Sequence, residues 1–182
     1  MAKKHLLLFL FPLLLTSCCY KDIKSAYGLP RKKIARLSDH FSHEKIDTLA
    51  LYKLQINYAY NRMSKEYIYF EKDNNNSYPY TSYLKFYKNG KLGLFIVPKT
   101  DTLRLERSFF DPQKAKMGYF EIQGQSIKTK ISTIGDCSLY ISNQTGEIKG
   151  DSIKLEGKNN HGNVYVKVNV PKTIVENWKP DW

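Results

Sequence analysis

Apolar and polar residues alternate with a period of two over much of the chain beyond residue 48. Tyr52, Leu54, Ile56, Tyr58 and Tyr60 alternate with polar side chains. This alternation is typical of a long β-strand that buries one face and exposes the other. Shorter runs of the same character predict further strands over 66–70, 80–87 and 92–97.

The strands over 80–87 and 92–97 flank an Asn-Gly pair at 89–90, which is a strong hairpin signal. A strict two-residue loop would place an aromatic residue opposite a glycine. A loop one residue longer instead pairs Phe86 with Leu94. It also pairs Leu84 with Ile96. We favour the longer loop, because strand register follows the buried face.

A repeated hairpin is the clearest internal signal. The sequence over 122–128 is matched by that over 148–154, 26 residues later. Gly124 and Gly150 would each take the first central position of a type II′ turn, where a positive φ suits glycine. Both copies then place an apolar pair on one face and an opposite-charge pair on the other. These pairs are Ile122–Ile127, Ile148–Ile153, Glu121–Lys128 and Glu147–Lys154.

The whole pattern predicts a mainly β protein. Two more strands are expected over 137–142 and 163–170, and a weak strand is marked by Leu103 and Leu105. About eight to ten short antiparallel strands with one short helix suit an up-and-down meander, closed into a small barrel or folded into a sandwich. Closure removes exposed edges, which favours the barrel.

The inward-facing residues of such a barrel would line either a filled core or a ligand cavity. A filled interior would exclude a carrier of small amphiphiles, and an open one would favour it. The residues expected there are Leu54, Ile56, Phe86, Leu94, Ile122, Ile127, Ile153 and Val166.

The first 17 residues have the composition of a secretory signal peptide. Lys3 and Lys4 form a positive region, and ten apolar residues follow over 6–15. This apolar run is too short for a stable membrane-spanning helix. Its removal would leave 165 residues and lower the formal charge from +12 to +10.

The end of this segment, Leu15-Thr16-Ser17-Cys18, resembles the lipobox of bacterial lipoproteins. The resemblance implies a diacylglyceryl group on the Cys18 thiol, cleavage before Cys18 and acylation of the new amine. Two or three acyl chains would hold the protein on a membrane, because each buried methylene contributes about 0.8 kcal/mol. The alternative is an ordinary signal peptide that happens to precede a cysteine. The lipobox predicts a lipid-anchored envelope protein, and a non-acidic Cys19 after the anchor favours the outer membrane by analogy with enterobacterial sorting.

Two further cysteines, Cys19 and Cys137, would remain in the mature chain. Export leads to an oxidising compartment, where these two could form a disulfide. The alternative is that Cys137 is a small buried apolar residue.

Residues 18–45 are expected to form a basic tether before a single β domain over 46–182. Seven basic and three acidic side chains lie within 19–45. Ile34, Leu37 and Phe41 recur at helical spacing and predict a short helix over about 31–44. Its basic side would rest on anionic head groups, or the segment would be a solvated linker.

The order of strands resembles that of small lipocalin-like domains found in envelope lipoproteins. The resemblance rests on Tyr83-Leu84-Lys85-Phe86-Tyr87-Lys88-Asn89-Gly90 and on Gly118-Tyr119-Phe120-Glu121-Ile122-Gln123-Gly124, and it covers about 48–170. It implies a small barrel. The chain departs from lipocalins in lacking Gly-x-Trp on the first strand, since no tryptophan precedes Trp178. A lipocalin-type ligand cavity is therefore not implied.

The sequence contains few candidates for chemistry. His40 and His43 could share a helix face and bind zinc, but a solvated face explains them as well. His161 lies in a polar turn, and no nucleophile elbow, phosphate loop or dinucleotide motif is present. We therefore expect no enzyme activity, no cofactor and no metal. The alternative is an unrecognised hydrolase, which would need a histidine beside a nucleophile in a cleft.

The net positive charge of the chain indicates either an anionic partner or a role in keeping the protein soluble. Many tyrosines and a pI near 9.5 would suggest nucleic acid for a cytosolic protein, but export argues against that. Anionic lipid or glycan head groups and an envelope protein are the expected partners, and spread charge for solubility is the alternative. The sequence predicts a non-catalytic binding or structural role. Two tyrosine-rich strands would supply contact area, one with Tyr52, Tyr58 and Tyr60 and the other with Tyr67 and Tyr69. The aromatic C-terminus, with Trp178 and Trp182, would pack on the barrel or form an exposed patch.

Overall fold

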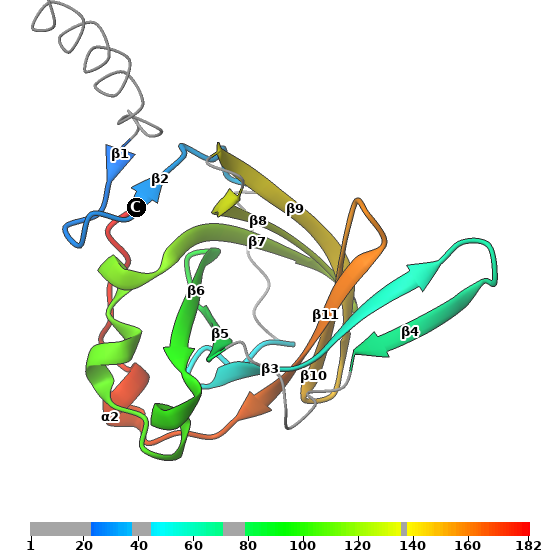
Figure 1. The fold of residues 1–182 in the computed structure, drawn as a ribbon. Helices are drawn as coiled ribbons and strands as arrows, with labels where there is room; N and C mark the ends of the chain where they lie inside the picture. Colours follow the sequence, from blue (N-terminus) through cyan, green and yellow to red (C-terminus); the bar gives the residue numbers. More distant parts are fainter. Residues whose placement is uncertain (1–22, 38–44, 71–78, 136–137) are drawn as a thin grey trace, which may run out of the picture.

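The computed structural model describes residues 23–37, 45–70, 79–135 and 138–182. Eight antiparallel strands form a closed barrel in which each strand pairs with the next along the chain, and β11 pairs with β3 to close the ring (Figure 1). These strands are β3 (Leu51–Asn61), β5 (Tyr80–Phe86), β6 (Lys91–Pro98), β7 (Lys116–Gln123), β8 (Ser126–Gly135), β9 (Ser138–Lys149), β10 (Ser152–Gly157) and β11 (His161–Val168). The prediction of a mainly β, up-and-down meander is confirmed, and the barrel is the alternative that forms.

One strand lies outside the ring. The strand β4 (Glu66–Phe70) pairs with the second half of β3, and together they form a hairpin that projects from the barrel (Figure 1). The predicted strand over 66–70 is therefore present.

Both copies of the repeated hairpin have the predicted register. Ile122 lies opposite Ile127, and Ile148 lies opposite Ile153. The charged pairs also lie as expected, Glu121 with Lys128 and Glu147 with Lys154. Gly124 and Gly150 have φ of +62° and +56°, whereas the residues after them do not have positive φ. A positive φ at the first central residue alone fits the predicted type II′ turn, whereas a type I′ turn would have a positive φ at both central residues.

The β5–β6 hairpin has the expected loop length but a different register. Residues 87–90 lie between the strands, and the Tyr87 N–H donates to the Lys91 carbonyl, so the turn encloses three residues, 88–90. Gly90 has φ +74°. Leu84 lies opposite Leu94, and Phe86 lies opposite Leu92. The predicted pairs, Phe86 with Leu94 and Leu84 with Ile96, are wrong by two residues. A shift of two keeps every side chain on the same face, so the alternation alone could not distinguish the two registers.

The barrel interior is an apolar core built from inward-facing side chains. Six of the eight expected lining residues belong to it, namely Leu54, Phe86, Leu94, Ile122, Ile127 and Ile153. The Phe86 ring packs edge-on against Phe120, with centroids 4.9 Å apart, and against Tyr52 at 5.3 Å. Aromatic pairs in this geometry stabilise a core beyond their area burial.

The other two expected lining residues, Ile56 and Val166, lie outside this core. The pairing of β3 with β11 shifts between Val164 and Tyr165, so that Leu54 and Ile56 lie opposite consecutive residues. Gln55 is thus an extra residue, and such a β-bulge reverses the facing of the residues that follow it. Ile56 therefore shares the outer face with Tyr58. Val166 lies opposite Lys53, and both point outward, since the neighbouring Tyr52 points into the core.

A second core covers the outer face of β5 and β6. Its main residues are Leu51, Tyr83, Phe95, Val97, Phe110, Ala115, Ile174 and Val175. They are brought together by the 3-10 helices η1 (Lys99–Leu103), η2 (Arg107–Phe110) and η3 (Pro112–Lys114) and by the helix α2 (Lys172–Val175). Figure 1 shows this layer along one side of the barrel. The predicted weak strand at Leu103 and Leu105 is wrong, because Leu103 ends η1 with its side chain in solvent, while Leu105 packs on the second core.

Part of the expected tether packs on the barrel. The short strands β1 (Ile23–Lys24) and β2 (Pro30–Arg31) form a small hairpin, and residues 32–37 contain no helix. Ile34 is buried against Met117 and Tyr119 of β7. The predicted helix is wrong for the described 31–37. Arg31 and Ile34 are buried and Leu37 is half-buried, so every third residue of this non-helical segment is shielded from solvent. This spacing is close to that of the apolar stripe of a helix, which is why the sequence pattern predicted one. Residues 38–44, with His40, His43 and Phe41, lie outside the described residues.

Among the described residues, no helix has both the length and the apolar character needed to cross a membrane.

Candidate functional site

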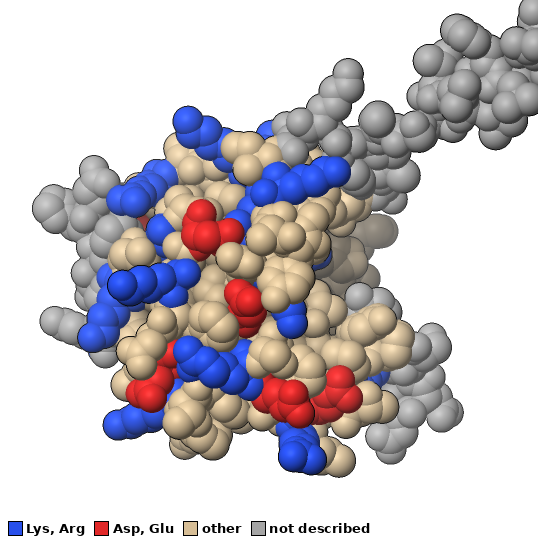
Figure 2. Space-filling model, turned by 90° about the vertical axis from the view of Figure 1, so that its left-hand side faces the viewer, with Lys and Arg blue, Asp and Glu red and all other residues tan. Residues whose placement is uncertain are grey.

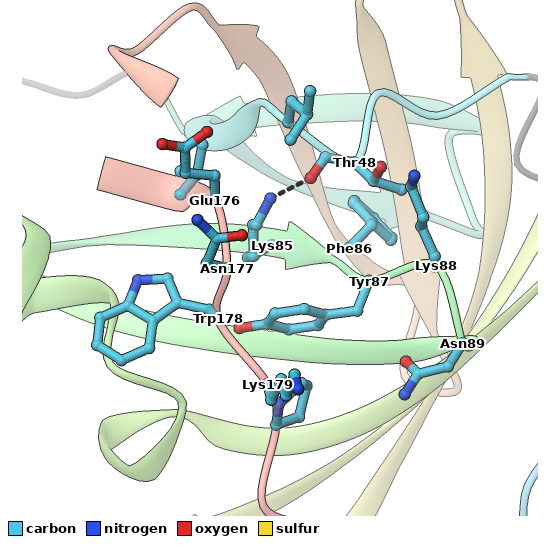
Figure 3. Close-up of a pocket in the computed structure, with 13 residues that line it drawn as sticks. Thr48, Lys85, Phe86, Tyr87, Lys88, Asn89, Glu176, Asn177, Trp178 and Lys179 are labelled. Carbon is cyan, nitrogen blue, oxygen red and sulfur yellow. Dashed lines mark hydrogen bonds between the residues drawn. The ribbon is translucent and has the colours of Figure 1, made fainter. Parts of the chain in front are cut away.

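A pocket of about 530 Å³ lies where the C-terminal segment passes the end of β5 (Figure 3). The segment before β3, the last residues of β5 with the following turn, and residues 175–180 form its walls. We call it the Lys85 pocket. Its lining residues are Thr48, Leu49, Lys85, Phe86, Tyr87, Lys88, Asn89, Val175, Glu176, Asn177, Trp178, Lys179 and Pro180.

Lys85 reaches this pocket because of the alternation along β5. Leu84 and Phe86 point into the barrel core, so Tyr83 and Lys85 point outward. The C-terminal segment covers this outer face, and the Lys85 side chain is only 2% exposed. Its ammonium donates a hydrogen bond to the Thr48 backbone carbonyl (Figure 3). Burial lowers the pKa of Lys85 to about 8, and the nearby Asp47 carboxylate partly opposes this shift.

Tyr87 supplies a second buried polar group. Its hydroxyl has no hydrogen-bond partner within the described residues, although the atom is shielded from solvent. An unsatisfied buried hydroxyl costs about 1–3 kcal/mol. Burial raises the pKa of Tyr87, and the charges of Asp111 and Asp181 raise it further, so the hydroxyl remains protonated. The Lys85 ammonium lies 5.8 Å from the centroid of the Tyr87 ring.

The C-terminal wall is held in place by two arginine contacts. Arg107 donates to the backbone carbonyls of Thr173 and Glu176, and its guanidinium lies 4.3 Å from the Trp178 ring centroid. Arg31 lies 5.0 Å from the Trp182 ring centroid.

The indole groups are themselves hydrogen-bonded. Trp178 donates to the Ile174 carbonyl at 3.0 Å, and Trp182 donates to the Gly118 carbonyl at 3.2 Å. The two tryptophans therefore pack along the outer side of the barrel, which is the packing alternative for the aromatic C-terminus.

The charges around the Lys85 pocket favour an anion. Lys85, Lys88 and Lys179 line it, against the single acid Glu176. On the face shown in Figure 2, basic side chains are spread among neutral and acidic residues and form no dense block. An apolar pocket with a few convergent polar groups is the usual form of a small-molecule site. This pocket can receive a negatively charged group beside Lys85 and apolar atoms against Leu49, Val175 and Trp178.

The sequence did not identify this pocket. Lys85 alternates with apolar neighbours and has the pattern of a solvated lysine on an exposed face. Its burial depends on a segment 90 residues further along the chain. Of the expected site residues, Phe86 lies at both the core and the pocket. Cys18, Cys19 and Cys137, the expected lipid anchor and disulfide, lie outside the described residues.

His161 is the one histidine candidate that lies within the described residues. His161 and Ser142 line a separate hollow of about 520 Å³, but no hydrogen bond joins their side chains in the described structure. Within the described ranges, no group of three His, Cys, Asp or Glu side chains is placed to hold a metal ion.

Comparison of the chain with protein-family models, with curated proteins and with solved structures found no match.

Proposed function

We propose that this protein is a lipid-anchored, non-catalytic binding protein of the bacterial cell envelope that takes a small amphiphilic anion in the Lys85 pocket. The observation that carries the binding role is the pair of buried polar groups at the pocket. Lys85 makes one described hydrogen bond, to a backbone carbonyl, and the Tyr87 hydroxyl makes none. A carboxylate beside Lys85 would recover electrostatic energy that burial of the ammonium has cost.

The apolar walls support an amphiphile over a simple inorganic anion. Leu49, Val175 and Trp178 present hydrocarbon and aromatic surface next to the lysine. A ligand with a carboxylate head and an alkyl tail would pair with Lys85 and remove its tail from water. Burial of apolar area contributes about 25 cal/mol per Å².

The alternative is a carrier of a small amphiphile that holds its ligand inside the barrel, in the way that lipocalins hold theirs. The inward-facing residues pack against one another, and Phe86 touches aromatic rings on two sides. This packing favours the outer pocket over the interior.

The binding role can be tested with octanoate as the anionic probe and octan-1-ol as an uncharged probe of the same chain length. Trp178 lines the pocket, so its fluorescence reports occupancy. We expect octanoate to change the tryptophan emission and to bind about tenfold more tightly than octanol. Lys85→Met should abolish this preference, whereas Lys128→Met, at an exposed lysine of β8, should leave it unchanged. Equal binding of both probes would contradict the proposal.

The anchor is tested separately. The sequence Leu15-Thr16-Ser17-Cys18 supports lipidation, and membrane-extracted protein should then show an intact mass with acyl chains on Cys18. Cys18→Ser should release the protein from the membrane fraction, while Cys19→Ser should not. An unmodified Cys18 in the membrane-extracted protein would refute the envelope assignment without affecting the pocket.

A further inference from the structure

Four tyrosines gather on the outer face of the projecting β3–β4 hairpin. Tyr58 lies opposite Tyr69, and Tyr60 lies opposite Tyr67, so all four side chains share one face. The ring centroids form a continuous cluster, with Tyr60–Tyr67 at 5.0 Å, Tyr58–Tyr67 at 5.5 Å and Tyr58–Tyr69 at 6.0 Å. The bulge at Gln55 is the cause, because it turns the later tyrosines of β3 away from the core.

The cluster has an anchored base and an exposed surface. Tyr58 is almost fully buried, and its hydroxyl donates to the Leu155 carbonyl at 3.2 Å. Tyr67 and Tyr69 are 43% and 51% exposed. Large aromatic side chains exposed side by side are uncommon on a soluble surface and mark contact sites.

A polar hollow of about 570 Å³ adjoins the cluster, and we call it the tyrosine groove. It is lined by Tyr58, Tyr67, Ser126, Thr145, Gly146, Glu147, Lys149, Lys154 and Glu156. The Lys154 ammonium lies 3.7 Å from the Tyr67 ring centroid and 4.7 Å from that of Tyr58. Glu147 pairs with Lys149 at 2.8 Å.

The composition of the groove selects among ligand classes. Two lysines and two glutamates balance in charge, in contrast to the net positive Lys85 pocket. Balanced donors and acceptors suit a neutral ligand with many hydroxyl groups, which both donates and accepts hydrogen bonds. A free cation is disfavoured, because the Lys154 ammonium already lies over the Tyr67 ring and close to the Tyr58 ring.

We propose that the tyrosine groove and the exposed rings beside it form a saccharide-binding site, in which a sugar ring packs on the exposed surfaces of Tyr67 and Tyr69 and its hydroxyls bond to the side chains lining the groove. A pyranose presents C–H groups on its face and hydroxyls at its edge. The face complements the electron-rich tyrosine rings. The edge complements Glu147, Lys149 and Thr145. This site is separate from the Lys85 pocket, and neither depends on the other.

The experiment uses the full-length mature protein with ring-labelled tyrosine, titrated with maltotriose, cellotriose and chitotriose while the tyrosine resonances are followed by NMR. At least one of these sugars should shift the Tyr67 and Tyr69 resonances at millimolar concentration. Tyr67→Ala combined with Tyr69→Ala should weaken the binding by roughly tenfold or more. Both residues are exposed, and circular dichroism would verify that the variant is folded.

The matched control is Tyr140→Ala, which removes an equally exposed tyrosine from β9 outside the cluster. Its affinity should equal that of the parent protein. Three results would overturn the inference: no shift with any of the sugars, an equal loss in the Tyr140→Ala control, or a shift of the same rings by tetramethylammonium alone, which would indicate a cation site.

Discussion

Arg31 and Asp181 are 150 residues apart in the chain and form an ion pair of 2.8 Å on the outer side of the barrel. The arginine side chain is 5% exposed and also donates to the Pro112 carbonyl at 3.0 Å. It therefore joins the segment before the barrel, the layer of 3-10 helices and the C-terminal segment. These contacts hold the segment that forms one wall of the Lys85 pocket.

Replacing Arg31 should loosen this junction. Arg31→Met removes the ion pair with Asp181, the bond to Pro112 and the contact with the Trp182 ring, while it keeps most of the apolar stem. We expect the free energy of unfolding to fall by about 2 kcal/mol, because hydrogen bonds to charged groups contribute roughly 1.5–3 kcal/mol. Urea unfolding measured by circular dichroism would check this value.

The control for this substitution is Arg36→Met, which changes an exposed arginine five residues further along the same segment. It should alter the stability by less than about 0.5 kcal/mol. Equal changes in the free energy of unfolding for the two variants would show that the contacts of Arg31 do not stabilise the fold.

The burial of Lys85 predicts a pH dependence of stability. Its pKa falls from 10.5 to about 8 in the folded protein, so between these values the unfolded chain binds more protons than the native one. The free energy of unfolding should therefore rise as the pH increases from about 8 toward 10. The full shift corresponds to about 3 kcal/mol, which is an upper limit for the gain.

Comparison with Lys85→Met isolates this contribution. Tyrosines with raised pKa, such as Tyr87, act in the opposite direction above pH 10, because only the unfolded chain then loses their protons. These groups are common to both proteins. Unfolding curves at several pH values between 7.5 and 9.5 should converge as the pH rises, with the variant more stable at the lower end. Parallel pH profiles would mean that Lys85 titrates normally.

The local features of this fold could be predicted from the sequence. Both copies of the repeated hairpin have the expected register, because a glycine at a fixed turn position, an apolar pair and a charge pair all specify the same alignment. Barrel strands that follow one another in the chain are also neighbours in the barrel, so a correct prediction of the strands nearly sufficed to predict the barrel.

Features that depend on distant parts of the chain could not be predicted. The bulge at Gln55 has no signal in the alternation of apolar residues, yet it decides which way Ile56, Tyr58 and Tyr60 face. The burial of Lys85 requires the C-terminal segment, and nothing within β5 indicates that cover. Both candidate sites arise from such long-range effects, which explains why sequence patterns alone missed their geometry.

The outward orientation that the bulge gives to Ile56 can be tested by comparing it with Ile153. The sequence pattern predicts that both isoleucines point into the barrel. Ile153→Ala removes a fully buried side chain of the inner core and should cost about 2–5 kcal/mol. Ile56→Ala removes a partly exposed side chain outside that core and should cost about 1 kcal/mol. Similar losses from chemical denaturation would indicate that Ile56 points inward and that the bulge is absent.

The approach of β9 to β10 predicts a strong effect at one glycine. A Cβ at Gly146 would lie 1.8 Å from the Lys154 carbonyl oxygen and 2.8 Å from its carbonyl carbon. Because both are backbone atoms, the strands must separate, and Gly146→Ala should lower the free energy of unfolding by about 3 kcal/mol or more. At Gly157, near the other end of this strand pair, a Cβ would meet its nearest neighbour at 3.6 Å, an ordinary contact. Gly157→Ala should therefore change the stability by less than about 1 kcal/mol. Gly146 also lines the tyrosine groove. If Gly146→Ala were tolerated as well as Gly157→Ala, β9 and β10 would lie further apart beside the groove than the structure shows.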